Sequence, residues 1–146
     1  MSLIIPSYCN STLEATLRAI DPKVENVADH YYWATVDDNN IVVTTFVGTF
    51  EVAEKFSVKK GTDYILSLQD SYNIAGAKAN HDYFWDSTRQ VFHPQQPYAS
   101  WTLDTSTWEW DPPIAHPMDN HYYWDEDAYQ ADTANPKTAG WTLTPE

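Results

Sequence analysis

The sequence predicts a mainly β protein of the α+β class: short antiparallel hairpins, one or two short helices near the N-terminus, and proline-rich connections. Three observations support this prediction. The 146 residues fit one ordinary domain, and 42% of them are apolar, which is enough to build a core. Aromatic and β-branched runs alternate with turn residues along most of the chain, and helical spacing of apolar residues occurs only in its first half.

Residues 1–29 are predicted to form an N-terminal arm that contains a short helix. An apolar run at Leu3, Ile4 and Ile5 precedes Pro6, and the sequence Ser-Thr-Leu-Glu at residues 11–14 is typical of a capping box. Asp21–Pro22 ends the helix after about nine residues, which is too short for stability in isolation. We therefore expect the extended run and the helical stripe to bury against a neighbouring subunit. The stripe consists of Leu13, Leu17 and Ile20.

Residues 30–80 are predicted to form a small α+β hairpin region. The runs 30–36 and 41–47 are rich in aromatic and β-branched residues, and the four residues between them, Asp-Asp-Asn-Asn, tolerate tight turns. Phe50, Ala53 and Phe56 recur at helical spacing up to Lys60–Gly61, where a helix is expected to end. A further strand is predicted at 63–69.

Residues 81–146 are predicted to form an aromatic- and proline-rich β-hairpin module with a C-terminal extension. Six of the seven tryptophans and seven of the nine prolines lie here. An aromatic run, an acidic or hydroxyl-rich turn and an aromatic return recur three times, at 83–92, 101–110 and 122–129, and Trp141–Leu143 repeats the wording of Trp101–Leu103. Prolines between these units favour extended connections.

Charge and cysteine content narrow the function classes. The formal net charge is −13, which repels phosphate backbones and anionic lipids, so neither nucleic acid nor a membrane is an expected partner. A single cysteine, Cys9, allows no internal disulfide and no cysteine-based zinc site. Neither Cys9 nor Ser100 lies in a nucleophile signature. We therefore expect no enzymatic activity and no cofactor.

Two possible metal sites, one for calcium and one for a transition metal, are less well supported than ordinary structural roles for the same residues. The oxygens of Asp119, Asn120, Asp125 and Asp127 suit calcium, but they lack the glycine-centred spacing of an EF-hand loop. The histidines show no pair at the helical spacing of a zinc hydrolase. Solvated turn carboxylates and packed histidines are the expected roles, and no metal site is predicted.

Several motifs occur in a fixed order between about His30 and Tyr129: HYYWATVDDNNIVV, NIAG, YFWDSTRQVF, PQQPYASWTLD, WEWDPP and HYYWDED. This succession resembles a family of small proteins encoded by marine tailed phages, mainly cyanophages, that are mostly uncharacterised or presumed particle proteins. The chain differs from the usual pattern by longer ends at 1–29 and 131–146, a shorter segment between Val47 and Tyr72, and no glycine pair or arginine before NIAG. The resemblance implies a phage source and brings no catalytic residues.

The function we expect is that of a phage virion structural protein, a small accessory subunit of the capsid or tail. Its partners would be other virion proteins and further copies of itself, and it would be located in the virion after assembly in the cytoplasm of the bacterial host. The Leu3–Ile5 run and the helical stripe would anchor it, and Trp110 and Tyr123 would be interface residues because strand neighbours alternate faces. Two alternatives remain: a receptor- or glycan-binding module on a tail fibre, with Trp110 and Tyr123 stacking on sugars, and an acidic protein that binds a basic site on a host protein.

Overall fold

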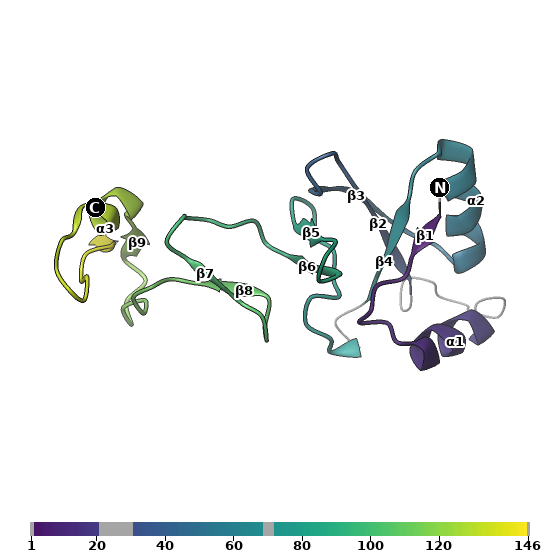
Figure 1. Cartoon of the computed structure of the whole chain (residues 1–146), viewed down its shortest axis with the longest axis horizontal. Coiled ribbons are helices and arrows are strands. Elements are labelled where there is room, and N and C mark those ends of the chain that lie inside the picture. Colours follow the sequence, from purple (N-terminus) through teal and green to yellow (C-terminus); the bar gives the residue numbers. More distant parts are fainter. Residues whose placement is uncertain (1, 21–30, 69–71, 146) are drawn as a thin grey trace. The chain divides into compact units, whose positions relative to one another are not determined.

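The computed structural model describes residues 2–20, 31–68 and 72–145, and the chain divides into two compact units (Figure 1). The first unit comprises residues 1–95 and 106–108, and the second comprises 96–105 and 109–146. The sequence placed a boundary near residue 80, whereas the structure places it after 95, because the aromatic hairpin at 84–93 packs on the first unit's sheet. The predicted helix stop at Asp21–Pro22, His30 and Gln69 lie outside the described residues.

A four-stranded sheet forms the centre of the first unit. Its strands are β1 (Leu3–Ile4), β2 (Tyr32–Val36), β3 (Val42–Val47) and β4 (Tyr64–Ser67), in the spatial order β1-β4-β2-β3 (Figure 1). β2 is antiparallel to both β3 and β4, and β1 is parallel to β4. The predicted hairpin is therefore confirmed as β2–β3. The N-terminal run is a strand of the sheet rather than an extended arm, because Leu3 lies opposite Tyr64 and Ile4 opposite Ile65.

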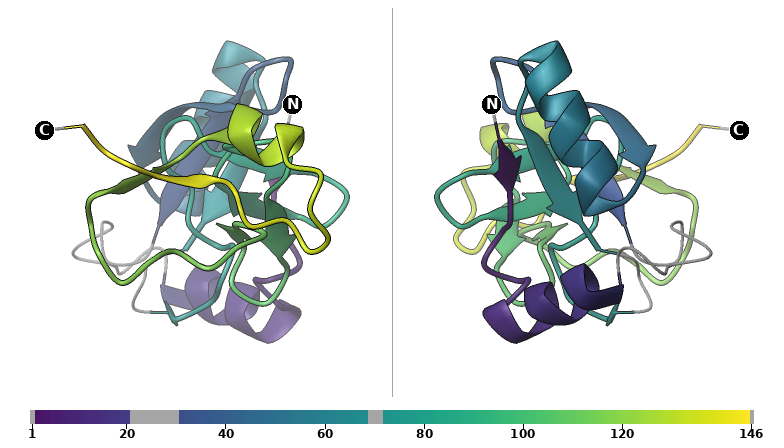
Figure 2. Two further views of the ribbon diagram at one scale, coloured as in Figure 1. Left: turned by 90° about the vertical axis from the view of Figure 1, so that its left-hand side faces the viewer. Right: turned by 90° about the vertical axis from the view of Figure 1, so that its right-hand side faces the viewer.

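Two helices accompany the sheet. α2 (Phe50–Lys60) begins where the Thr49 hydroxyl accepts a hydrogen bond from the amide of Val52, and it ends at Gly61, whose φ of 62° is the left-handed conformation that glycine favours. The predicted helix and its glycine stop are confirmed. α2 crosses one face of the sheet (Figure 2).

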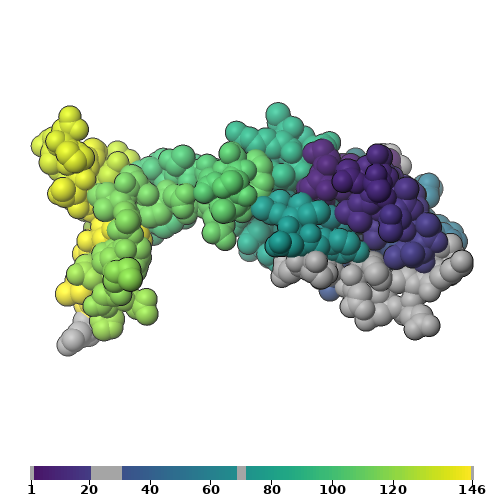
Figure 3. Space-filling view, turned by 90° about the horizontal axis from the view of Figure 1, so that it is seen from below, coloured from purple at the N-terminus to yellow at the C-terminus, as the bar shows by residue number. Residues whose placement is uncertain are grey.

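α1 (Ser11–Ile20) lies at the surface of the first unit (Figure 3), and its only fully buried residue is Leu17. The helix forms where it was predicted, but its cap is Asn10, whose side-chain oxygen accepts from the amide of Leu13. Glu14 does not complete a capping box with Ser11. Its carboxylate oxygen Oε1 instead accepts a hydrogen bond from Nε of Arg18, one helical turn later, at 3.0 Å.

The sheet has a hydrophobic cluster on each face because neighbouring strand residues point in opposite directions. Trp33 and Leu66 lie opposite each other and join Phe50 of α2 and Leu17 of α1 in one cluster. The Trp33 indole N–H donates to the carbonyl of Gly48, and the Tyr31 hydroxyl donates to the carbonyl of Leu17, each at 2.8 Å. The cluster thus satisfies the polar groups of its two largest buried side chains.

The opposite face is covered by the chain that follows β4. Ala34 and Ile65 lie opposite each other on this face and contact Trp85 and Phe92. These two aromatic residues belong to the predicted hairpin, which forms as β5 (Phe84–Asp86) and β6 (Val91–His93). This arrangement explains why one aromatic hairpin belongs to the first unit.

The second unit contains β7 (Thr102–Asp104), β8 (Glu109–Asp111), β9 (Tyr122–Trp124), α3 (Glu126–Ala131) and β10 (Trp141–Leu143). The β7–β8 hairpin and the strand at Trp141 are confirmed. The third predicted hairpin, at 122–129, is wrong: the acidic turn is the start of α3, because the Asp125 carboxylate accepts from the amide of Ala128. β9 pairs instead with β10, so that Trp124 lies opposite Trp141.

Candidate functional site

The open edge of the four-stranded sheet is the first feature of a candidate interaction surface. β3 ends the sheet, and its first residue, Val42, exchanges main-chain hydrogen bonds with Tyr83 and Asp82 at 2.8 and 3.0 Å. Within the described part of the chain, residues 43–47 make no main-chain hydrogen bond on their outer side. An edge with unpaired amides and carbonyls can accept a strand from another chain.

Apolar side chains flank this open edge. Val43 and Val47 of β3, and Val52 and Phe56 of α2, are each between 37% and 41% exposed. The Phe46 ring connects strand and helix, because it lies edge-on to Phe56 with ring centroids 5.7 Å apart. Val47 points to the opposite face of the sheet from Phe46, so exposed apolar side chains flank the edge on both faces. We call these five residues the β3–α2 surface.

The composition of β3 explains why the edge is unprotected. Its sequence, VVTTFV, holds neither proline nor a charged side chain, the two devices that most often prevent edge-to-edge pairing. In a protein with 21 acidic and 8 basic residues, an uncharged strand of six residues at a sheet edge is a local exception. The sequence showed the strand but not its position at the edge, since strand order depends on contacts far along the chain.

The predicted anchoring residues contact their own chain. Leu3, Ile5, Leu13 and Ile20 pack on the cluster that contains Leu17, and Ile4 packs on the opposite cluster. Leu17 is 1% exposed. The N-terminal run and the helical stripe thus help to close the first unit's core, and the run is a strand rather than an extended arm. The physical reason is the β1–β4 pairing, which a hydropathy pattern does not encode. Contact of these residues with a neighbouring subunit stays a prediction.

The two predicted aromatic interface residues differ in exposure. Tyr123 is 45% exposed, whereas its neighbour Trp124 is 5% exposed, as the alternation of strand side chains predicts. Trp110 lies opposite Leu103 in β8 and is half-buried. Trp108, two residues before Trp110, lies in the turn before β8 with a φ of 60°, so strand alternation does not relate the two side chains.

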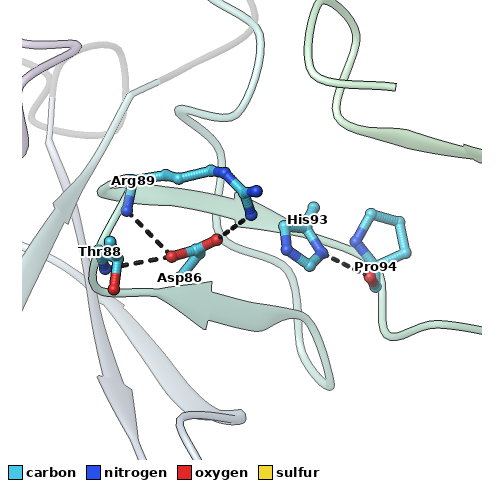
Figure 4. Close-up of polar contacts among 5 residues, drawn as sticks. All are labelled: Asp86, Thr88, Arg89, His93 and Pro94. Atoms are coloured by element: carbon cyan, nitrogen blue, oxygen red, sulfur yellow. Dashed lines mark hydrogen bonds and ion pairs between the residues drawn. The ribbon is translucent and has the colours of Figure 1, made fainter. Parts of the chain in front are cut away.

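Trp108 belongs to a polar and aromatic cluster of the first unit. Its ring stacks on that of His93 with centroids 6.3 Å apart and an interplanar angle of 11°, and the Arg89 guanidinium lies 6.0 Å from it. Figure 4 shows Arg89 reaching the Asp86 carboxylate, at 2.9 Å, and His93 pointing to the carbonyl of Pro94. These contacts hold the β5–β6 turn.

The hydrogen bonds in this cluster determine the ionisation of Asp86. Its Oδ1 accepts from the amides of Thr88 and Arg89 at 3.1 and 3.0 Å. Burial favours a higher pKa of Asp86, but the hydrogen bonds and positive charge of Arg89, with the Thr88 amide, outweigh it and lower the pKa. A carboxylate stabilised in its charged form by its own turn has a structural role.

Glu126 is the most strongly bonded carboxylate of the second unit. It accepts from the hydroxyl and amide of Ser100 at 2.6 and 3.0 Å, from the Trp124 indole at 2.8 Å and from the Gln130 amide at 2.9 Å. The Ser100 hydroxyl first, then the other donors, lower the pKa of Glu126 to about 2. A carboxylate with this pKa is too weak a base to activate Ser100 near neutral pH.

The environments of the remaining candidates, the Cys9 thiol and the acidic residues considered as metal ligands, also favour a structural role. Burial, then the nearby charge of Glu14, raise the pKa of the Cys9 thiol to about 11, so the nucleophilic thiolate is not populated at neutral pH. The carboxylates of Asp125 and Asp119, which we weighed from the sequence as calcium ligands and set aside, accept hydrogen bonds from the amides of Ala128 and His121. Among the residues that the structure describes, no three His, Cys, Asp or Glu side chains gather as a metal site would require.

Comparisons with known proteins leave the chain without an assigned family. No protein-family model, curated protein or solved structure matches it significantly. No helix in the described residues has the length and apolar character needed to span a bilayer.

Proposed function

We propose that the chain is a small accessory structural subunit of a tailed-phage particle, on the capsid or the tail, and that it binds neighbouring virion proteins or further copies of itself through the β3–α2 surface. The observation that carries the binding role is the open edge of β3 beside exposed Val47, Val52 and Phe56. The assignment to a phage particle is supported by the motif order between His30 and Tyr129. The subunit would be assembled in the cytoplasm of the bacterial host and retained in the virion.

Physical chemistry favours this surface as an interface. A strand added to β3 would pair its open main-chain groups, and the flanking valine and phenylalanine side chains would lose water at about 25 cal/mol per Å² of apolar area. The strand itself bears no charge, so the net charge of −13 opposes association only through more distant groups. The acidic residues elsewhere would keep assembled particles dispersed.

Quantitative mass spectrometry of purified particles, from the phage that encodes the chain, tests the proposal. We expect the chain to copurify at a fixed ratio to the major capsid protein. Hundreds of copies of the chain per particle would indicate a capsid location, and about a dozen copies would indicate the tail. Absence from purified particles would contradict the structural role.

A matched pair of variants tests the surface. Val47→Lys places a charge on the open edge, where lysine blocks strand pairing without disturbing the strand itself. Incorporation into particles should fall more than tenfold, because the ammonium would lose water on assembly. Val58→Lys makes the same change at a 72% exposed position of α2, beside Lys55 and Lys59, and should incorporate normally. Equal incorporation of both variants would exclude the β3 edge.

A second function, glycan binding, has one specific observation in its favour. Tyr123 is 45% exposed on β9, and its cross-strand partner is Thr142, a residue that carries a hydroxyl group. An exposed aromatic face beside a polar group suits the stacking of a sugar ring. Binding of host polysaccharide that is lost in Tyr123→Ala but kept in Leu143→Ala would support this function. No binding by the unmodified protein would exclude it.

A further inference from the structure

The outer part of β3 is complementary to a second copy of itself. Val42 is already paired with residues 82–83 through main-chain hydrogen bonds, so the segment that another strand can reach is 43–47, with the sequence VTTFV. Within the part of the chain that the structure describes, no main-chain hydrogen bond reaches the outer side of this segment. Four of its five residues are exposed, and β2 pairs with it in regular register from Thr44 to Val47. The segment is thus a preformed strand, ready to pair on its outer side.

One antiparallel register pairs the whole segment with its own copy. In an antiparallel pair of identical strands, the two-fold axis passes beside a residue that faces itself. With Thr45 at this position, Val43 faces Val47 of the second copy, and Thr44 faces Phe46. All five residues of the segment then have a cross-strand partner.

The two ends of the segment exclude the neighbouring registers. An axis beside Thr44 would place Phe46 of the second copy opposite Val42, whose outer amide and carbonyl already bond to residues 82–83. An axis beside Phe46 would place Thr44 opposite Gly48, where β3 has ended. Each of these shifts loses pairs, so the register with Thr45 on the axis is favoured.

The pairs in this register are of stabilising types. Val43 and Val47, which are 41% and 40% exposed in the single chain, would cover each other at two symmetric positions. Pairs of β-branched residues, aromatic with β-branched pairs and threonine with threonine all stabilise antiparallel strands. The segment has no charged side chain, so two copies place no like charges directly opposite each other. A two-fold interface requires a surface that is complementary to itself, and this strand satisfies that requirement.

The same symmetry brings the two α2 helices to one face. The two-fold axis of an antiparallel strand pair is perpendicular to the sheet, so both helices lie on the side of Phe46. Val52 and Phe56, which are 40% and 37% exposed, would approach those of the second copy beside the axis. The other edge of the sheet is β1, which has only two residues and offers no comparable strand. Pairing would therefore stop at the dimer.

We propose that two copies of the chain pair through residues 43–47 of β3, with Thr45 on the two-fold axis, and form a dimer with one continuous sheet. This inference rests on the proposed function, because it names the partner at the β3–α2 surface. The dimer would be the form that enters the particle, and its remaining surface would contact the other virion proteins.

Sedimentation equilibrium of the full chain tests the pairing. We expect twice the monomer mass of 16.8 kDa at high protein concentration, and tighter association at higher salt, because each copy has a net charge of −13. Val47→Lys should weaken dimerisation at least tenfold, since each copy would place an ammonium group against Val43 of the other. Val58→Lys, at a 72% exposed position of α2, should dimerise as the unmodified chain does. A chain that stays monomeric at about 1 mM would overturn the inference.

Disulfide formation tests the register. Thr45→Cys places the new thiol beside that of the second copy, where paired Cα atoms lie about 4.5–5.5 Å apart, within disulfide range. Val47→Cys is the matched control, because it changes another exposed residue of β3 whose two copies would be about 13 Å apart along the strand. Mild oxidation should cross-link Thr45→Cys and neither Val47→Cys nor the unmodified chain, whose Cys9 is 4% exposed. Equal cross-linking of the two variants would overturn the register.

Failure of this inference and failure of the proposed function give different results. A monomeric chain without Thr45→Cys cross-links overturns the self-pairing. If Val47→Lys is then still excluded from particles while Val58→Lys is incorporated, the β3 edge binds a different virion protein and the proposed function stands. A dimer cross-linked through Thr45→Cys, from a chain that is absent from purified particles, supports the self-pairing and contradicts the virion role.

Discussion

Replacing Gly140 by alanine should unfold the second unit selectively. Gly140 has a φ of 144°, a backbone conformation that residues with a Cβ rarely adopt. A Cβ built at this position would lie 2.5 Å from two ring atoms of Trp124. That ring cannot move aside easily, because it is 5% exposed and lies edge-on to both Trp101 and Trp141.

The expected magnitude follows from two separate costs. The backbone conformation costs an alanine about 1–3 kcal/mol, and overpacking against a fixed ring adds about 1–3 kcal/mol. A unit of roughly 50 residues has a total stability of about 2–7 kcal/mol. The substitution therefore removes most of the stability of this unit, and the Trp101, Trp124 and Trp141 environments should become solvent-like.

Near-ultraviolet circular dichroism and NMR during urea unfolding measure this effect. In Gly140→Ala the tryptophan signals of the second unit should be lost at low urea, whereas the resonances of Trp33 and Trp85 in the first unit should persist. Gly61→Ala is the control for backbone cost alone, since Gly61 is exposed and has a φ of 62°. If Gly140→Ala unfolds within about 0.5 kcal/mol of the unmodified protein, the packing argument is refuted.

Three further predictions concern stability. Leu17→Ala should destabilise the first unit by about 2–5 kcal/mol in urea titrations, because Leu17 is 1% exposed, and a loss below 1 kcal/mol would contradict its place in the core. Asn10→Ala should cost about 0.5–2 kcal/mol and Ser11→Ala much less, measured in the same way; the reverse order would restore Ser11 as the cap of α1. The pKa of Glu126 is lowered from 4.5 to about 2 in the folded protein, so the stability contributed by its ionised form is complete above pH 4.5 and is lost as the pH falls towards 2. Unfolding of Glu126→Gln, measured at several pH values, should therefore depend less on pH in this window, and an unchanged pH dependence would contradict the network around Glu126.

The turns and helix ends that are stabilised by residues close to them in sequence could be predicted from local sequence patterns. The turn at 37–40 joins β2 and β3 as expected, because the Asp37 carboxylate accepts from the amides of Asn39 and Ile41. α2 ends at Gly61 for the reason given from the sequence. The cap of α1 is Asn10 and not the predicted Ser11. Both residue types can cap a helix, and only the backbone geometry selects between them.

Long-range pairings escaped prediction for a physical reason. β1 pairs with β4, and β9 pairs with β10 across α3, so neither partner lies next to the other in sequence. The acidic residues 125–127 suit a turn and a helix start equally well, and the contacts of Trp124 with Trp141 favour the second. The β3–α2 surface was not predicted because β3 becomes an edge only when β4 pairs with β2 on its other side. Tyr123 was predicted as exposed, since this required only the alternation of strand side chains.

The parallel pairing of β1 with β4 determines the order in which the first unit can be completed during synthesis. Leu3 and Ile4 leave the ribosome before their partners Tyr64 and Ile65, which follow about 60 residues later. At about 5–20 residues per second, the N-terminal segment has no strand partner for about 3–12 seconds. Its apolar side chains are available to chaperones during that time, and the sheet closes on the side of β1 only after β4 has emerged.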